Sequence, residues 1–273
     1  MTPANKQYRE VVKFISGIVT VILMVLISSC QKIVNIDLNS ASPKFVIEGV
    51  ITDSVGPFHV TLTKSGSYFD QPVLPPVSGA SIIISDDHGN EDTLIEKQPG
   101  IYFTSKIGGI PGDNYSLKVI AENNEFEAYT SMKSHVDIDS LTVEENQGIG
   151  GRTHRSVICH FHDPKSEKNY YRIKFYTNGK TNSESYRLYD DQYTNGENID
   201  IRAGGAEVGD TNVVVLMSID KRAYDYYHTL EEILRTNPLF GSTPANPNTN
   251  LTNGALGYFA AYTVSTKPII ITK

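Results

Sequence analysis

Apolar and polar residues alternate at period two through most of this chain, which is the pattern of strands with one buried face. Short turns containing Gly, Pro or Asn separate these runs, so that strand, turn and strand recur about every 8–12 residues. The runs occupy 44–53, 58–64, 81–85, 93–97, 101–105, 115–122, 126–132, 137–145, 156–163, 169–177, 186–202, 212–220, 258–266 and 268–272. The pattern predicts an all-β protein with two tandem antiparallel β-sandwich-like domains. We expect 156–163 and 169–177 to pair, and the run 212–220, apolar on both faces, to lie centrally in a sheet.

One segment, about 221–236, has the period of an α-helix instead. Its apolar residues stand at positions i, i+4, i+7 and i+11, which is one helical face. They are Ala223, Tyr227, Leu230 and Leu234. Asp220 is suited to cap the helix N-terminus, and Pro238 prevents the helix from continuing. We therefore expect one helix within the second β-rich domain.

The N-terminus carries an uncharged apolar run, residues 14–27, preceded by basic residues. A membrane-spanning helix needs about 20 apolar residues, whereas the apolar region of a secretory signal has about 7–15. The run therefore predicts a signal peptide, helical over 11–28. It ends in Ile27-Ser28-Ser29-Cys30, which resembles a bacterial lipobox. The resemblance implies acylation of the Cys30 thiol and cleavage just before it; an uncleaved signal anchor is the alternative.

Composition limits the classes of partner. The chain of 273 residues has a net charge of −7. Without residues 1–29, which hold three basic residues and one acidic residue, 21 of 24 basic and 30 of 31 acidic residues remain, and the net charge is −9. Such an acidic chain is a poor candidate for binding nucleic acid, because that affinity depends on neutralising phosphates. After Cys30 the only cysteine is Cys159, which we interpret as a small buried strand residue.

The first half of the chain resembles a known β-sandwich module. The motifs are Gly79-Ala80 before an alternating strand, Gly100-Ile101-Tyr102, and a late strand from Gly112 to Val119. They are similar to those of carboxypeptidase-regulatory-like and other immunoglobulin-like modules, which are structural or binding units. The resemblance and the signal divide the chain into a signal peptide (1–29), a lipidated tether (30–42), an immunoglobulin-like β-sandwich (43–135) and a C-terminal β-rich domain (136–273).

The C-terminal part carries a more specific resemblance. The stretch PANPNTNLTNGALGYFAAYTVS begins at Pro244 and includes Asn253-Gly254-Ala255-Leu256-Gly257-Tyr258-Phe259. It resembles the signature of the domain-of-unknown-function 4249 family of Bacteroidetes lipoproteins, and the likeness extends over essentially the whole chain. Members of that family tend to accompany TonB-dependent receptors. The resemblance therefore implies a lipoprotein (palmitate at Cys30) in the cell envelope, anchored to the outer membrane, in a leaflet that the sequence does not specify.

Two clusters of polar residues contain side chains that could bind a metal ion. His160 and His162 lie on one strand face, with Asp163 and His154 nearby, and two imidazoles at i, i+2 can share an ion. The alternative is a pair of solvated strand residues around a buried Phe161. The acidic turn 86–92, beginning with Asp86-Asp87, could gather oxygens around calcium, but it lacks the spacing of a calcium loop and is equally explained as a charged hairpin. We expect neither a metal nor another cofactor.

The motifs G-x-S-x-G and H-E-x-x-H are absent from the sequence. We therefore expect a non-enzymatic outer-membrane lipoprotein, an accessory or ligand-capturing partner of a TonB-dependent transporter. The alternatives are a surface adhesin or structural lipoprotein and a carbohydrate-active hydrolase. The long loop 238–257 and the strand after it are the expected contact surface. The expected contact residues are Asn246, Asn250, Asn253, Tyr258 and Tyr262.

Overall fold

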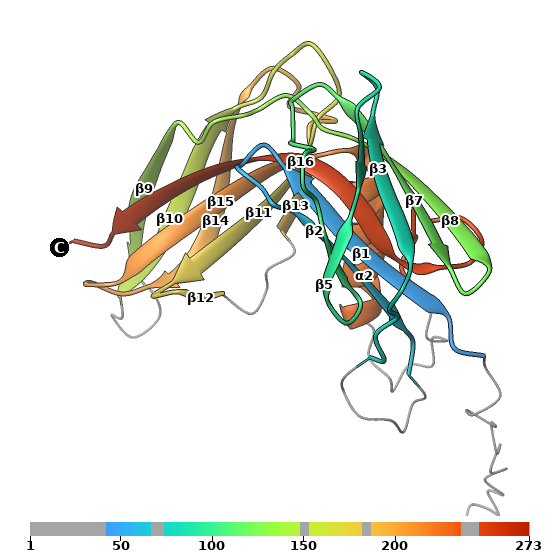
Figure 1. Cartoon of the computed structure of the whole chain (residues 1–273). Coiled ribbons are helices and arrows are strands. Elements are labelled where there is room, and N and C mark those ends of the chain that lie inside the picture. Colours follow the sequence, from blue (N-terminus) through green and yellow to red (C-terminus); the bar gives the residue numbers. More distant parts are fainter. Residues whose placement is uncertain (1–41, 67–73, 148–152, 182–186, 236–245, 273) are drawn as a thin grey trace, which may run out of the picture. The chain divides into compact units, whose positions relative to one another are not determined.

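The computed structural model describes residues 42–66, 74–147, 153–181, 187–235 and 246–272, and residues 42–273 form one compact unit (Figure 1). The predicted signal helix at 11–28, the predicted lipid attachment site Cys30 and the predicted helix stop at Pro238 lie outside the described residues. Within the described ranges, no helix is long and apolar enough to cross a membrane.

Sixteen strands and one helix make up the described part of the chain, which confirms the all-β class. The strands are β1 (Phe45–Thr52), β2 (His59–Lys64), β3 (Ser81–Asp86), β4 (Glu91–Thr93), β5 (Ile95–Gln98), β6 (Ile101–Phe103), β7 (Asn114–Ala121), β8 (Asn124–Ser131), β9 (Ser140–Gln147), β10 (Thr153–His162), β11 (Tyr170–Thr177), β12 (Lys180–Thr181), β13 (Arg187–Asp190), β14 (Asn198–Ala206), β15 (Thr211–Ile219) and β16 (Leu256–Ile270). The helix is α2 (Lys221–Arg235).

The strands form three sheets. A nine-stranded sheet has the order β12-β11-β15-β16-β1-β2-β6-β5, with β13 also pairing with β11. A four-stranded sheet has the order β4-β3-β7-β8, and a three-stranded sheet has the order β14-β10-β9. The doubly apolar strand β15 lies between β11 and β16, which confirms its expected central position.

The nine-stranded sheet takes part in two sandwiches. One core joins strands β1, β2 and β6 to the four-stranded sheet and includes Ile47, Tyr102 and Leu117. A second core joins β11 and β15 to the three-stranded sheet and includes Cys159 and Tyr171. The alternating pattern read from the sequence thus produces the expected sandwich-like packing, with the apolar faces of the core strands turned inward.

The long strand β16 takes part in both sandwiches, on either side of the expected division of the chain at 135/136. Its first half, from Leu256 to Tyr262, pairs in parallel with β1, and its second half pairs antiparallel with β15. The two sandwiches therefore share one sheet, in which the β1–β16 pair is parallel and the other pairs are antiparallel. The separate strands predicted at 258–266 and 268–272 are one strand. Pro268 does not interrupt it, because this part of β16 pairs only with β15 among the described strands, and proline is tolerated where one side of a strand has no neighbour.

The expected pairing of 156–163 with 169–177 is also wrong. β10 pairs with β9 and β14, whereas β11 pairs with β12, β13 and β15. The buried faces of the two strands point at each other across the second core. The rings of Phe161 and Tyr171 lie 4.9 Å apart between centroids, and the Tyr171 hydroxyl donates to Asp163 at 2.5 Å. Strands that turn apolar faces toward one another belong to facing sheets rather than to neighbours in one sheet.

Helix α2 lies on the outer face of the nine-stranded sheet, at the position predicted from the sequence. Asp220 caps it as expected, because its Oδ1 accepts a hydrogen bond from Ala223 N at 2.7 Å. Its Oδ2 accepts from Thr130 Oγ1 and Ser131 N, which ties the helix start to β8. Leu234, expected on the buried face, is 63% exposed.

Gly257 is required where β16 meets β1. Its φ is +90°, and a Cβ built on it would lie 2.2 Å from the carbonyl oxygen of Ile47, its partner in the parallel register. Gly254, three residues earlier, also has a positive φ of +74°, but its Cβ would meet nothing within 4 Å. At Gly254 a side chain would meet backbone strain alone, whereas at Gly257 it would meet both backbone strain and steric overlap.

We predict that Gly257→Ala destabilises the protein much more than Gly254→Ala. Both variants hold alanine in the left-handed region, which costs roughly 1–2 kcal/mol. Only Gly257→Ala also forces β16 away from β1. The midpoints of urea unfolding test this, and equal shifts for the two variants would show that the β1–β16 contact tolerates a methyl group.

Candidate functional site

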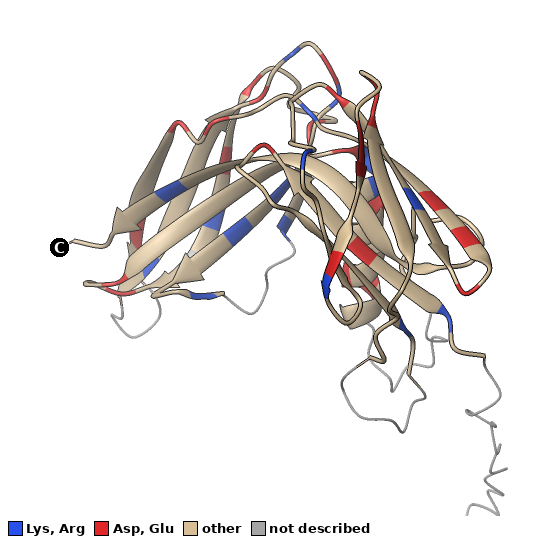
Figure 2. Ribbon diagram, in the orientation of Figure 1, with Lys and Arg blue, Asp and Glu red and all other residues tan. Residues whose placement is uncertain are grey.

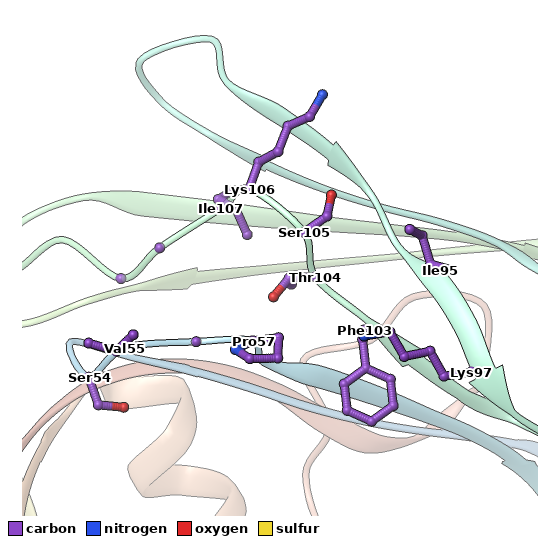
Figure 3. Close-up of a pocket in the computed structure, with 13 residues that line it drawn as sticks. Ser54, Val55, Pro57, Ile95, Lys97, Phe103, Thr104, Ser105, Lys106 and Ile107 are labelled. Atoms are coloured by element: carbon purple, nitrogen blue, oxygen red, sulfur yellow. The ribbon is translucent and has the colours of Figure 1, made fainter.

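A groove of about 620 Å³ opens beside the last strands of the nine-stranded sheet (Figure 3). Three segments line it: the loop between β1 and β2, strands β5 and β6, and the loop that follows β6. The lining residues are Ser54, Val55, Gly56, Pro57, Ile95, Lys97, Phe103, Thr104, Ser105, Lys106, Ile107, Gly108 and Gly109. Ligand sites typically have about 300–1,000 Å³, so the groove is large enough for a small molecule or a short peptide segment.

Asp92 holds the loop that forms one wall of this groove. Its buried carboxylate accepts hydrogen bonds from the backbone N–H groups of Ser105, Lys106 and Ile107, at 2.6–3.0 Å, and from the Ser105 hydroxyl. Burial raises the pKa of Asp92, but these donors outweigh burial and bring the pKa below its ordinary value. A carboxylate with this many donors fixes the loop while it stays charged.

Further contacts anchor the same loop at both ends. Thr104 Oγ1 accepts from the backbone N–H of Phe58 at 2.8 Å, which joins the loop to the start of β2. The Tyr115 hydroxyl accepts from Ile110 N at 2.8 Å and donates to Gly108 O at 3.1 Å. The groove wall is therefore held in place by hydrogen bonds rather than formed only when a ligand arrives.

The groove combines apolar surface with positive charge. Val55 is 98% exposed and Ile95 is 54% exposed. The ammonium group of Lys97 lies over the ring of Phe103, 5.1 Å from its centroid, and Lys106 stands on the wall held by Asp92. Acidic residues are spread over the strands of both sandwiches (Figure 2), yet none lines the groove.

The predicted contact loop 238–257 is described only from Asn246 onward, and most of that part packs against the chain itself. The Asn250 side chain donates to Phe259 O at 2.7 Å and Tyr129 O at 3.2 Å, and accepts from Phe259 N at 3.1 Å. The Asn253 side chain donates to Glu125 O at 2.7 Å. These two amides therefore hold the loop between β16 and β8. Asn246 is exposed.

Tyr258 and Tyr262 lie beneath helix α2. Tyr258 is 5% exposed and its ring stacks on Tyr226 at 4.8 Å between centroids. β16 turns Tyr258, one of the expected contact residues, toward the helix, where its ring also meets Tyr227. Tyr262 is half-buried, and burial raises the pKa of its hydroxyl to about 12, with the Tyr227 hydroxyl contributing next.

Part of the predicted contact loop lines a smaller surface hollow of about 240 Å³. It lies between β8, α2 and the loop. Its lining residues are Tyr129, Arg222, Asp225, Asn248, Thr249 and Asn250. Asp225 forms an ion pair with Lys221 at 2.6 Å, so its charge is already partly neutralised. This volume falls below the range typical of ligand sites.

The histidines of β10 do not converge with Asp163. His160 Nδ1 lies 2.6 Å from Asp200 Oδ1, its Nε2 lies 2.7 Å from Thr142 Oγ1, and His162 Nδ1 lies 3.0 Å from Asn198 Oδ1. Asp163 faces the core on the opposite side of the strand, where it is fully buried. The two histidines therefore interact with the neighbouring strands β9 and β14.

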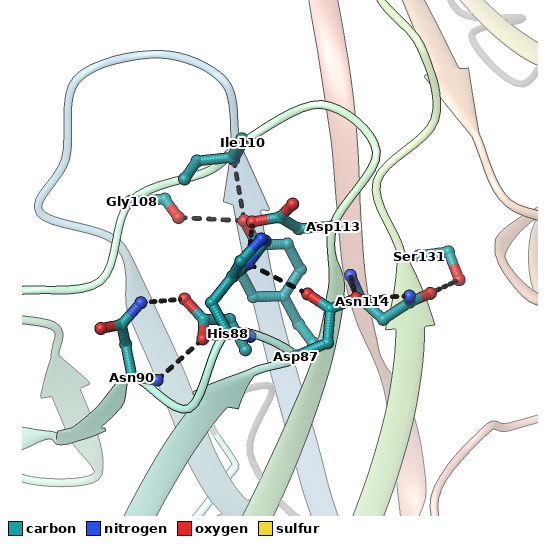
Figure 4. Close-up of polar contacts among 10 residues, drawn as sticks. Asp87, His88, Asn90, Gly108, Ile110, Asp113, Asn114 and Ser131 are labelled. Atoms are coloured by element: carbon teal, nitrogen blue, oxygen red, sulfur yellow. Dashed lines mark hydrogen bonds and ion pairs between the residues drawn. The ribbon is translucent and has the colours of Figure 1, made fainter.

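The acidic turn predicted at 86–92 is a β-hairpin turn between β3 and β4. Asp86 Oδ1 accepts from the backbone N–H groups of His88 at 3.0 Å and Asn90 at 2.8 Å, and Gly89 takes a positive φ. Asp92 points away into the groove wall. Asp113, from the loop before β7, comes close to His88 (Figure 4). Among the described residues, Asp86, His88 and Asp113 are the group of three whose ligand atoms could meet at one ion.

Cys159 is fully buried, as the sequence predicts. Burial raises the pKa of its thiol to about 12, and the carboxylate of Asp139 adds to the effect. A reactive cysteine needs the opposite shift, because the thiolate is the nucleophile. The setting of this residue is that of a core side chain.

Sequence reasoning missed the groove and the contribution of Asp113. The exposed apolar residues Val55 and Ile95 were visible in the sequence, but their proximity depends on which strands pair. Asp113 stands in a Gly-Pro-Gly-rich turn, where an acidic residue is ordinarily solvated. Its burial follows from the pairing of Asp86 with Tyr115 in the β3–β7 register.

We predict that Asn250→Ala lowers the free energy of unfolding by about 1–3 kcal/mol, because it leaves buried backbone groups of Phe259 without partners. Asn246→Ala, at an exposed position of the same loop, should change it by less than about 0.5 kcal/mol. Urea unfolding of both variants measures the difference. If the two variants are equally stable, Asn250 has no structural role and a contact role regains support.

Of three comparisons with known proteins, one identifies a family. No curated protein matches it. Among solved structures, the selenomethionine-substituted chicken interferon gamma receptor alpha chain matches with 13% identity over 65% of this chain and 90% of that chain, at a TM-score of 0.18, which is too low to support any argument. The profile of one family, described as Domain of unknown function (DUF4249), matches residues 31–268. Because this match covers most of the sequence, the chain belongs to the DUF4249 family.

Proposed function

We propose that this protein is a non-enzymatic lipoprotein of the bacterial outer membrane that binds an extended, acidic segment of a partner protein in the groove of Figure 3. The partner is a TonB-dependent transporter, to which the lipoprotein is an accessory. The observation that carries the proposal is the groove itself: a preformed, apolar and positively charged surface on an acidic protein.

The charge of the groove favours an acidic partner segment. Among the described residues that line the groove, Lys97 and Lys106 are the charged ones. The lysine salt bridges of the described residues lie elsewhere and involve Lys64, Lys118, Lys133 and Lys221. Because complementary charge steers association and excludes wrong partners, two lysines that have no salt bridge among the described residues would select carboxylate-bearing segments.

The position of the groove favours an extended segment. Strand β5 ends the nine-stranded sheet, and its residues Ile95 and Lys97 line the groove. A strand at the end of a sheet offers backbone N–H and C=O groups to an added strand, while side-chain pockets give specificity. Val55 and Phe103 then supply apolar contact for the side chains of that segment.

The membrane anchor and the partner are inferred from the sequence. The lipobox at Ile27-Ser28-Ser29-Cys30 would place two or three acyl chains at the N-terminus, which is enough for durable anchoring. Lipoproteins resembling this chain tend to accompany TonB-dependent receptors, and a tether at residues 30–42 would keep the groove within reach of such a neighbour. A surface adhesin or structural lipoprotein would share the anchor but would need no transporter.

We predict that Cys30→Ala abolishes lipid labelling and leaves an uncleaved precursor, because the thiol is the attachment site. Cys159→Ala is the matched control, since it removes the other cysteine and should leave labelling intact. Incorporation of alkyne-palmitate together with the intact mass of each variant measures this. Labelling or normal processing of Cys30→Ala would contradict the anchoring proposal.

We also predict that Lys97→Glu with Lys106→Glu lowers recovery of the transporter at least about tenfold, because like charges then face each other in the groove. The full chain would carry a C-terminal tag in the bacterium that encodes it. Outer membranes would be solubilised in detergent, and the retained proteins would be quantified by mass spectrometry.

Lys165→Glu with Lys180→Glu is the matched control, because both lysines are exposed, lie outside the groove and undergo the same change of charge. A wild-type chain that retains no transporter would exclude the accessory role and favour the adhesin or structural alternative. A transporter retained equally by both double variants would show that the groove is not the contact surface.

A further inference from the structure

The tip of the β3–β4 hairpin and the loop before β7 bring three ligand-type side chains together. Asp86 and His88 belong to the hairpin, and Asp113 belongs to the loop. One ligand atom from each lies within 4.8 Å of the other two. Figure 4 shows His88 close to both Asp87 and Asp113. This cluster lies outside the groove of the proposed function, which none of the three residues lines.

Asp113 carries an unsatisfied group directed into this cluster. Its side chain is 9% exposed, and among the described residues its buried Oδ2 receives no hydrogen bond. His88 Nδ1 lies 3.3 Å from this oxygen. A buried carboxylate oxygen without a donor is costly unless a cation compensates it. The fold therefore leaves one binding direction open toward His88.

Two separations around His88 fit tetrahedral coordination. Zinc binds imidazole nitrogen and carboxylate oxygen at about 2.0–2.2 Å, which puts neighbouring ligand atoms about 3.3–3.6 Å apart. His88 Nδ1 lies 3.3 Å from Asp113 Oδ2 and 3.3 Å from Asp87 Oδ1. One ion could thus contact His88 and Asp113 without a rearrangement of the backbone.

Hydrogen bonds orient the carboxylates around His88. Asp86 is fixed by two backbone donors and by Asn90 Nδ2, which lies 2.7 Å from Asp86 Oδ2. Asp87 Oδ2 accepts from Asn114 Nδ2 at 2.8 Å, and Asn114 in turn accepts from the Ser131 hydroxyl at 2.6 Å. Such outer contacts are what hold metal ligands in place in known sites.

We propose that Asp86, His88 and Asp113 bind a divalent transition-metal ion, Zn²⁺, with Asp87 or water in the fourth position. The imidazole nitrogen of His88 favours zinc over calcium and magnesium. Calcium and magnesium take oxygen ligands almost exclusively, whereas zinc accepts a mixed set of nitrogen and oxygen at low coordination number. The ion would neutralise the carboxylates of the hairpin and the buried oxygen of Asp113.

Calorimetric titration of the full chain with ZnCl₂ tests this proposal. The protein would be purified in detergent with a tag that lacks histidine and stripped with a chelator that is then removed. We expect one Zn²⁺ per chain. His88→Gln and Asp113→Asn should each weaken binding at least about tenfold, the size of loss typical even for outer contacts of a metal site. A parallel titration with CaCl₂ should give no binding.

His162→Gln is the matched control, because it removes another exposed histidine and also tests the pair on β10. It should bind zinc like the wild type. His88 is exposed, so its variant remains informative if Asp113→Asn fails to fold. The proposal is overturned if the wild type binds no zinc, if His88→Gln binds as tightly as the wild type, if His162→Gln loses binding, or if calcium binds and zinc does not.

Discussion

The parallel pairing of β16 with β1 is the contact on which the rest of the fold depends. It aligns Val46 with Leu256 and continues to Thr52 and Tyr262, so it joins the beginning of the described chain to its end. The second half of β16 pairs with β15 and enters the other sandwich. Contacts this distant in sequence cost chain entropy before they contribute energy, and the apolar residues of β16 offset that cost on both faces. Phe259 and Ala261 enter one core, while Tyr258 and Ala260 meet α2.

Local patterns were sufficient to predict the strands and the helix, and insufficient to predict their partners. Period-two alternation marks the buried face of β10 and β11, and a 3.6-residue period with a capping Asp220 marks α2. Alternation says nothing about which apolar face meets which. Phe161 and Tyr171 carry the same pattern whether their strands are neighbours or face each other across a core. The parallel pair was invisible for the same reason, because the distance along the chain between its strands gives no local signal.

The candidate sites differ in how much the sequence could reveal. The asparagines of the 246–257 stretch suggested ligand contacts, yet Asn250 and Asn253 donate to backbone carbonyls and hold the chain together. A side-chain amide is equally suited to either task, so residue type alone does not decide. The acidic hairpin was correctly located as a turn. Its nearby partner Asp113 was not, because only the β3–β7 register brings that residue beside His88.

The segment 104–114 connects the two proposed sites physically and keeps them distinguishable. Asp92 fixes its first part, which forms the groove wall, and Tyr115 fixes its middle. Its last part carries Asp113, and burial together with the charge of Asp113 raises the pKa of the Tyr115 hydroxyl. An ion bound at Asp113 would remove the unsatisfied charge at one end of the segment, whereas Lys106 acts at the other end. Each end of the segment is held by its own hydrogen bonds, so loss of binding at one site leaves the contacts of the other site in place. A more rigid segment would favour ligand binding at both sites.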